Sequence, residues 1–166
     1  MPVKNLSDFF VHALSDTYSA EKQMTRSLPK LARAATDEGL ASAFETHLEE
    51  TRGQVERIEQ IAELLQVKLK RIKCEGMAGL VEEGDSLIDQ IAKGPVLDAA
   101  LIGAARKVEH YEIAGYHSLC TLAKQLGHTD AIALLEASLA EETATDSKLG
   151  ALAEAQAVQE ADAAEG

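Results

Sequence analysis

The stretch LSDFFVHALSDTYSAEKQMTRSLPKL, residues 6–31, returns as LDAALIGAARKVEHYEIAGYHSLCTL at residues 97–122 with the same spacing of apolar side chains. In both stretches apolar or small residues recur at steps of three and four, which is the spacing of one helix face. A glutamate interrupts the pattern at the same point, Glu21 in the first stretch and Glu112 in the second. The repeat therefore predicts two equivalent helices, each with a carboxylate on its apolar face.

Each of these helices is followed by a second amphipathic segment. The spacing of apolar residues predicts one helix over 38–66 and another that begins near Thr129. The strings LEET at 48–51 and AEET at 140–143 lie at equivalent places in the two segments and extend the repeat. The chain thus divides into two helical hairpins of similar design.

Both strings hold a pair of glutamates, of which one can face the core. In LEET, Glu50 lies on the flank of the apolar stripe, whereas Glu49 points to the opposite side of the helix. In AEET, Glu142 is central in the stripe, but the phase of the repeat would match Glu50 with Glu141 instead. We expect Glu142 to face the core and keep Glu141 as the alternative.

The segment between the hairpins decides the topology. Residues 67–96 break the pattern with the basic string VKLKRIK, followed by a short amphipathic piece, which indicates a long crossover with its own helix. Two hairpins joined in this way predict an all-α, ferritin-like four-helix bundle. The length fits a single domain over 1–166. The tail at about 154–166 has no strong stripe and is expected to fray.

Composition narrows the classes of partner. The formal charge of −12 opposes binding to nucleic acid and to anionic lipid. No apolar run has the length of a membrane span, and the first residues do not read as a signal peptide, so we expect a cytoplasmic protein. Cys74 and Cys120 form no C-x-x-C motif, which excludes a rubredoxin-type site. Redox turnover would therefore need an external electron donor.

The four inward carboxylates predict a metal site. An ionised carboxylate in an apolar interior costs several kcal/mol, so it is normally protonated, paired with a cation or bound to a metal. Glu21 and Glu50 lie at similar distances from the turn between their helices, as do Glu112 and Glu142 from theirs. Each hairpin therefore brings its two carboxylates to within about one helical turn of the same level.

The sequence departs from the usual ligand pattern of di-metal bundles, which carry Glu-x-x-His on two of their helices. Here Glu50 is followed at that spacing by Gly53, and Glu142 by Thr145. Side chains near the same faces are candidates to replace the histidines, and a second glutamate precedes Glu112 by one turn. These further candidate ligands are His47, Gln54, Asp146 and Glu109. The tyrosines Tyr18, Tyr111 and Tyr116 are expected mainly to pack.

Four segments resemble the YciF/YciE family of bacterial stress-associated ferritin-like proteins. They are SDTYSAEKQ at 15–23, HLEETRGQVERIEQI at 47–61, KVEHYEIAGY at 107–116 and EETATD at 141–146. The resemblance covers nearly the whole chain. It implies four bundle helices plus a crossover helix, a homodimer, and a relation to rubrerythrin and bacterioferritin.

Two functions follow as hypotheses. Oxygen ligands suit Fe and Mn, with Zn as a further option, so the first is a non-haem di-metal protein, most simply di-iron. Such a protein would handle peroxide, oxygen or iron during stress, with peroxidase or oxidase activity as the candidate chemistry. The alternative is a metal-free dimeric helical bundle with a structural or interaction role, whose core carboxylates are protonated or paired.

Overall fold

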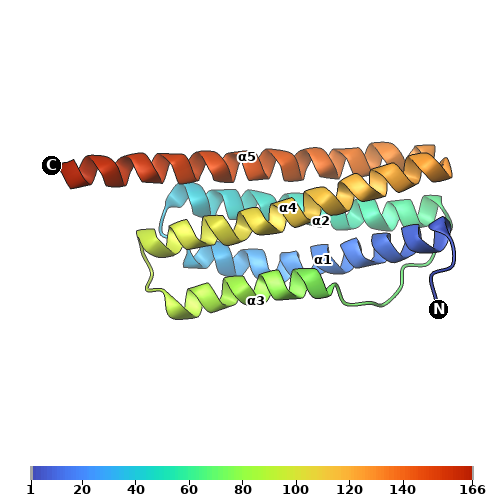
Figure 1. Ribbon diagram of the computed structural model, residues 1–166, viewed down its shortest axis with the longest axis horizontal. Helices are drawn as coiled ribbons and strands as arrows, with labels where there is room; N and C mark the ends of the chain where they lie inside the picture. Colours follow the sequence, from blue (N-terminus) through green and yellow to red (C-terminus); the bar gives the residue numbers. More distant parts are fainter. Residues whose placement is uncertain (1, 166) are drawn as a thin grey trace.

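The computed structural model describes residues 2–165, which form five α-helices and, within that range, no strand (Figure 1). The helices are α1 (Leu6–Ala34), α2 (Glu38–Leu64), α3 (Glu75–Gln90), α4 (Pro95–Leu126) and α5 (Thr129–Glu165). The hairpin of α1 and α2 packs against the hairpin of α4 and α5 through α1 with α4 and α2 with α5. The predicted all-α bundle of two hairpins is confirmed.

Local sequence sets the helix ends. The Asn5 side chain caps α1 by accepting the backbone N–H of Asp8 at 2.8 Å, and Asp37 caps α2 through the N–H of Leu40 at 2.8 Å. Helix α4 ends at Gly127, whose φ of 72° is a left-handed conformation that glycine adopts without strain. The two short turns that follow α1 and α4 therefore make the hairpins antiparallel.

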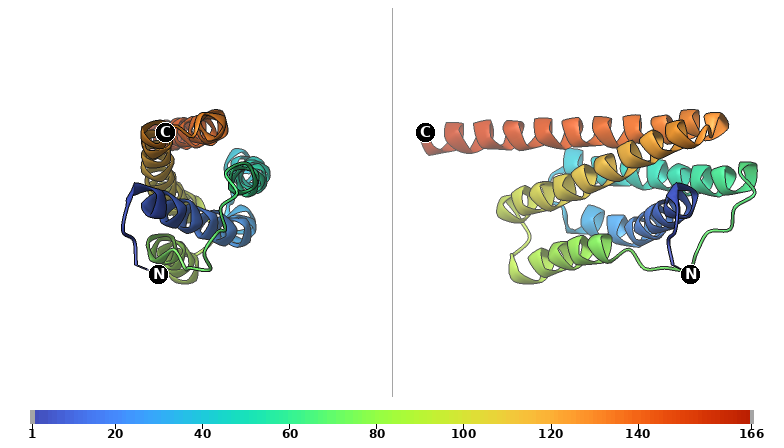
Figure 2. Two further views of the ribbon diagram at one scale, coloured as in Figure 1. Left: turned by 90° about the vertical axis from the view of Figure 1, so that its right-hand side faces the viewer. Right: turned by 45° about the vertical axis from the view of Figure 1, so that its right-hand side comes forward.

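The crossover lies along α1 on the side of the bundle away from α5 (Figure 2). The backbone N–H groups of Lys70 and Cys74 donate to the hydroxyls of Ser15 and Ser19, each at 2.9 Å, which fastens the extended part of the crossover to α1. Helix α3 then packs against α1 and α4. The predicted crossover with its own helix is therefore present, between Leu64 and Pro95.

The buried carboxylate of Asp98 joins the two hairpins. Its two oxygens accept the backbone N–H groups of Thr36 and Asp37 at 2.7 and 2.9 Å, so the first turn of α4 is held against the α1–α2 turn. This contact fastens the start of α4 to the turn between α1 and α2.

The C-terminal end differs from the expectation. Helix α5 continues to Glu165 and projects past the ends of the other helices (Figure 1), so the predicted fraying of the tail is not seen as far as residue 165. Residue 166 lies outside the described residues. The segment is rich in Ala and Glu, which have high helix propensity and need no apolar stripe to continue a helix that has already formed.

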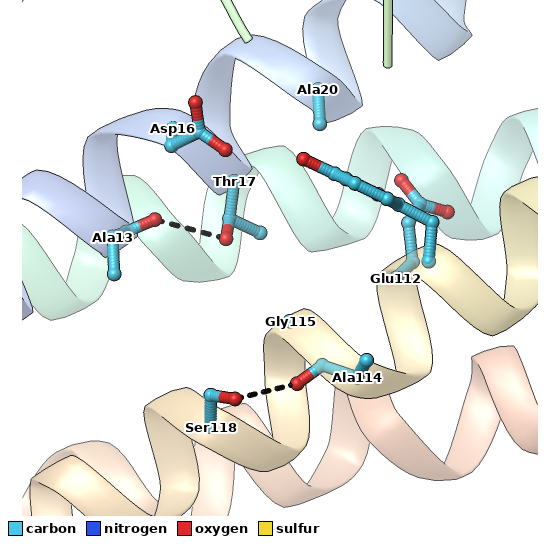
Figure 3. Close-up of a pocket in the computed structure, with 9 residues that line it drawn as sticks. Ala13, Asp16, Thr17, Ala20, Glu112, Ala114, Gly115 and Ser118 are labelled. Carbon is cyan, nitrogen blue, oxygen red and sulfur yellow. Dashed lines mark hydrogen bonds between the residues drawn. The ribbon is translucent and has the colours of Figure 1, made fainter. Parts of the chain in front are cut away.

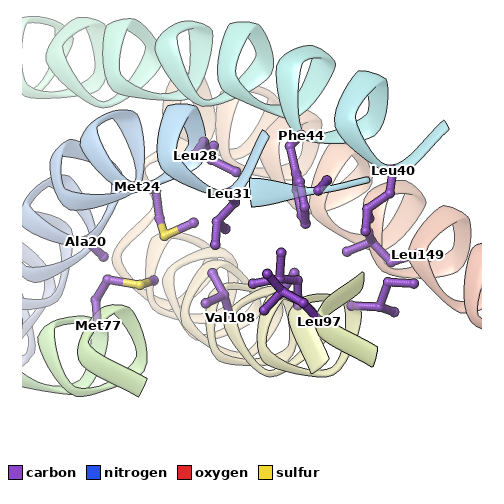
Figure 4. Packing of buried hydrophobic residues seen from close by; sticks show 14 of the residues in the cluster. Ala20, Met24, Leu28, Leu31, Leu40, Phe44, Met77, Leu97, Val108 and Leu149 are labelled. Carbon is purple, nitrogen blue, oxygen red and sulfur yellow. The ribbon is translucent and has the colours of Figure 1, made fainter. Parts of the chain in front are cut away.

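Two apolar clusters fill the bundle, one toward each end. The first lies near the α1–α2 turn and includes Met77 of α3, which lies next to Met24 of α1 (Figure 4). The second lies near the α4–α5 turn and contains Phe10, Ile58 and Tyr116. None of the helices in residues 2–165 is long and apolar enough to cross a membrane.

Candidate metal centre

A layer of buried polar side chains separates the two apolar clusters. Each of the four long helices contributes to it, and on α2, α4 and α5 its members lie between the buried residues of the first cluster and those of the second. Every member is at most 9% exposed. The layer consists of Glu21, His47, Thr51, Gln54, Glu109, Glu112, Ser138, Glu142 and Thr145.

Four of these side chains come together closely enough to bind one ion. One ligand atom from each of His47, Glu109, Glu112 and Glu142 lies within 4.8 Å of the other three. His47 Nε2 is 3.0 Å from a Glu109 oxygen and 3.7 Å from a Glu142 oxygen. The group joins α2, α4 and α5, so it forms only when the two hairpins pack.

The carboxylates of this group are poorly satisfied by the protein. Both oxygens of Glu112 and of Glu142, and one oxygen of Glu109, have no hydrogen-bond partner among the described residues. His47 approaches Glu109 closely, but neither of its ring nitrogens has the geometry of a hydrogen bond. Because a buried polar atom without a partner is costly, the donor set fits a bound cation.

Glu21 lies in the same layer beside Glu112, on the α1 side. The Tyr116 hydroxyl donates a hydrogen bond to one of its oxygens, and the other oxygen has no partner. Burial raises the pKa of Glu21 to about 7, although the hydrogen bond from Tyr116 acts to lower it. Tyr116 therefore holds the Glu21 carboxylate in addition to filling the apolar cluster as expected.

The pKa values of the layer's side chains are shifted because several carboxylates lie close together and are buried away from water. Burial, together with the nearby charge of Glu21, raises the pKa of Glu112 well above its usual value. Burial and the charge of Glu112 do the same to Glu142. Burial acts to lower the pKa of His47, but the carboxylates of Glu109 and Glu50 outweigh it and raise that pKa to about 10. Without a metal, the layer therefore favours bound protons.

Glu50 stands at the edge of the layer. Its side chain is 34% exposed, and one oxygen lies 3.6 Å from Nδ1 of His47 and accepts a hydrogen bond from Thr145 at 3.3 Å. The nearby His47 lowers the pKa of Glu50. Gln54 is fully buried, donates to Glu141 at 3.1 Å and leaves its carbonyl oxygen without a partner. Both side chains flank the four-residue group without belonging to it.

Two of the acidic candidate ligands, Glu141 and Asp146, are paired with arginines outside the four-residue group. Arg57 binds Glu141 through both of its terminal nitrogens at 2.6 and 2.7 Å. Arg106 donates to Asp146 at 2.9 Å, and His110 Nε2 lies 3.2 Å from the same carboxylate. Because a guanidinium already compensates each of these charges, Asp146 and Glu141 do not join the unsatisfied group.

The structure thus brings together most of the side chains that the sequence indicated. Glu112 and Glu142 lie in the four-residue group with Glu109 and His47, which the sequence offered only as secondary candidates. The sequence pattern did not indicate the contact of Arg57 with Glu141. The position of Arg57 three residues after the buried Gln54 places it near the same helix face and could have indicated an inward contact.

Comparison with known proteins agrees with this architecture. The family model described as "Domain of unknown function (DUF892)" matches residues 5–162. Protein YciF of Escherichia coli (strain K12) is 57% identical over 154 residues, which cover 92% of this chain and 93% of that protein. These matches confirm the resemblance seen in the sequence.

Solved structures show the same fold. The crystal structure of the E. coli stress protein YciF has a TM-score of 0.90 at 56% identity and covers 93% of this chain and 98% of its own. YcfI from Rhodopseudomonas palustris, described as a putative structural protein, has a TM-score of 0.86 at 40% identity and covers 89% of this chain and 94% of its own. The chain belongs to the DUF892 family and is similar to YciF over most of its length.

Proposed function

We propose that this protein is a non-haem di-metal carboxylate protein that binds two Fe ions, with Mn or Zn as alternatives, and handles peroxide, oxygen or iron. One observation carries the proposal: His47, Glu109, Glu112 and Glu142 converge in a buried layer with most of their ligand atoms unsatisfied. Carboxylate oxygens with one imidazole are a donor set that suits these metals.

The ligand roles follow from position. Glu109, Glu112, Glu142 and His47 would hold metal directly, and Glu21 would serve a second ion from the α1 side. Glu50 is placed to complete the shell from the exposed edge. With these residues holding two redox-active ions, the site would supply two electrons to dioxygen or peroxide. This is the chemistry of a peroxidase or an oxidase.

The surrounding residues serve this site by orienting ligands and excluding water. Tyr116 fixes one oxygen of Glu21 through its hydroxyl and leaves the other free to bind. The apolar clusters on both sides keep the layer dry, which strengthens electrostatic binding of a cation. The two free cysteines, Cys74 and Cys120, provide no electron-transfer centre, so turnover would require an external donor.

Metal content after purification without chelator tests the proposal. We expect close to two ions per chain in the wild type by elemental analysis, and a large loss in a Glu112→Gln, Glu142→Gln double variant. Glu141→Gln is the matched control, because Glu141 lies on the same helix but is bound by Arg57. A wild type that takes up neither Fe(II) nor Mn(II) would refute the proposal.

A second function, a metal-free structural bundle, has one observation in its favour. A protonated His47, 3.0 Å from Glu109, compensates part of the buried charge without any metal. The R. palustris relative is also described as a putative structural protein. The two functions give different thermal melts: a structural bundle would unfold at the same temperature with chelator and with Fe(II).

Assembly and setting are part of the proposal. A homodimer would cover exposed apolar side chains at the start of the chain, namely those of Val3, Leu6 and Phe9. Light scattering should then give twice the chain mass.

We also propose a single domain over 1–166, a cytoplasmic location without a nucleic-acid partner, and a role in stress, for which the E. coli relative is named.

A further inference from the structure

The ligand side chains pose a problem of access. His47, Glu109, Glu112 and Glu142 are each at most 2% exposed. A divalent ion that reaches them must pass between helices and must shed much of its water on the way. The molecule therefore needs a path with polar oxygen atoms along it.

A pocket of about 280 Å³ between α1 and α4 leads toward one of these ligands. Figure 3 shows Ala13, Asp16 and Thr17 of α1 opposite Gly115 and Ser118 of α4 across the opening. Its rim includes the exposed Tyr111, Ala114 and Ser118, whereas Glu112, another of its lining residues, is buried. The pocket thus reaches from the surface to the buried residue Glu112, whose carboxylate oxygens have no hydrogen-bond partner among the described residues.

The lining has the charge that a cation requires. Among the nine lining residues are two acids, Asp16 and Glu112, and no lysine, arginine or histidine. The hydroxyls of Thr17 and Ser118 donate to the backbone oxygens of Ala13 and Ala114 at 3.0 and 2.9 Å. A hydroxyl that has given its proton to a carbonyl still offers lone pairs to a cation.

Small side chains keep the pocket open. Ala13, Ala20 and Gly115 line it, and a Cβ atom added at Gly115 would lie 4.0 Å from the Thr17 hydroxyl across the opening. One methyl group would fit there, but a branched side chain at residue 115 would occupy the space itself. The width of the route therefore depends on Gly115.

We propose that this pocket is the route by which divalent cations enter the bundle, with Asp16 collecting the ion near the rim and Glu112 receiving it at the inner end. The proposal rests on the proposed metal-binding function and deepens it. Asp16 is here a positioning residue for uptake and is no ligand of the final site. Its removal should slow binding without changing how much metal is bound.

Uptake of Co(II) alone by the metal-free protein, followed by stopped-flow absorption, tests the role of Asp16. We expect Asp16→Asn to slow uptake by roughly tenfold, since acidic residues in a cleft raise the association rate of cations. Higher ionic strength should slow the wild type more than the variant. The matched control is Asp89→Asn, which removes the same charge from an exposed position on α3.

A second variant tests the route independently of charge. Gly115→Val should block the opening and slow uptake at every ionic strength. Gly103→Val is the control, because it makes the same change on the same helix at a position where an added Cβ meets no atom within 4 Å. Circular dichroism verifies that both variants are helical.

The outcomes separate the route from the site. Slow uptake in both variants with unchanged final Co(II) stoichiometry supports the route. Wild-type uptake rates in either folded variant would overturn it, as would a lower final stoichiometry in Asp16→Asn, which would make Asp16 a ligand. A wild type that binds no Co(II), Fe(II) or Mn(II) would instead overturn the proposed function.

Discussion

The polar layer and the apolar cluster near the α1–α2 turn both draw on α1, α2, α4 and α5 and are both buried, yet their chemistry is opposite. In the cluster, Phe44, Leu101 and their neighbours bury hydrocarbon, which is the main favourable contribution to folding. In the layer, Glu112 and Glu142 bury carboxylates whose oxygens have no partner. Under the proposed function, the layer would serve metal binding at a cost to the stability of the metal-free protein.

The largest expected effect is the loss of stability when a side chain of the apolar cluster is truncated. Phe44→Ala should lower the free energy of unfolding by about 3–5 kcal/mol, because it removes a fully buried aromatic side chain and leaves a cavity. Urea denaturation in chelator measures the change. Val96→Ala is the control, since Val96 is 68% exposed, and it should change the free energy of unfolding far less.

The stability of the metal-free protein should depend on pH through the titrating groups of the polar layer. The pKa values of Glu112 and Glu142 are raised well above the usual value. The pKa of Glu21 is raised to about 7 and that of His47 to about 10. A raised folded pKa gives stability that is present at low pH and is lost as pH rises through that value. The free energy of unfolding in chelator should therefore fall by a few kcal/mol between about pH 5 and pH 8.

Two carboxylates near the layer have the opposite effect on the pH dependence of stability. Glu50 and Asp146, whose pKa values are lowered, act in the opposite direction, but they titrate in more acidic solution. Chemical denaturation across the pH range measures the slope. Glu112→Gln should flatten it, and a stability that increases from pH 5 to pH 8 in chelator would contradict the interpretation.

Addition of metal should reverse the penalty of the layer near neutral pH. An ion that binds only the folded chain stabilises it by about 2.7 kcal/mol at a hundredfold excess over its Kd. Differential scanning calorimetry with Fe(II) under argon, compared with chelator, measures the shift in Tm. The shift should grow with pH, since metal displaces protons from the same carboxylates, and an unchanged Tm would favour the structural function.

A single isosteric change compares the two regions directly. Glu112→Gln should leave the metal-free protein as stable as the wild type or more stable, by about 1 kcal/mol, because glutamine has the same shape and does not need to take up a proton to be buried near neutral pH. The same variant should lose most of the Tm increase with Fe(II). A strong destabilisation in chelator would mean that Glu112 is satisfied by the protein, which would count against the site.

The smallest expected effect concerns the cysteines. Replacement of Cys74 and Cys120 by Ser should leave the metal stoichiometry unchanged, because both thiols lie in the apolar clusters and outside the four-residue group. Elemental analysis of the double variant measures this. Loss of metal in the double variant would show that thiolates, and not only oxygen atoms, bind the metal.

The sequence by itself determined the helices and their pairing. The spacing of apolar residues and the repeat of Glu21 at Glu112 are local patterns, so they predicted two hairpins and two inward carboxylates without any knowledge of packing. The burial of Glu142 also followed from its central place in an apolar stripe. The helical tail was not predicted, since helix propensity sustained α5 where the stripe ended.

Only the tertiary structure decided which polar side chains share the layer. Glu141 and Glu142 are neighbours in sequence, but Arg57 of another helix binds the first and leaves the second unsatisfied. Arg106 likewise removes Asp146 from the group, whereas no lysine or arginine pairs with Glu112 among the described residues. The physical reason is that a carboxylate is compensated by whatever charge a different helix brings within a few ångström, and sequence spacing on one helix does not contain that distance.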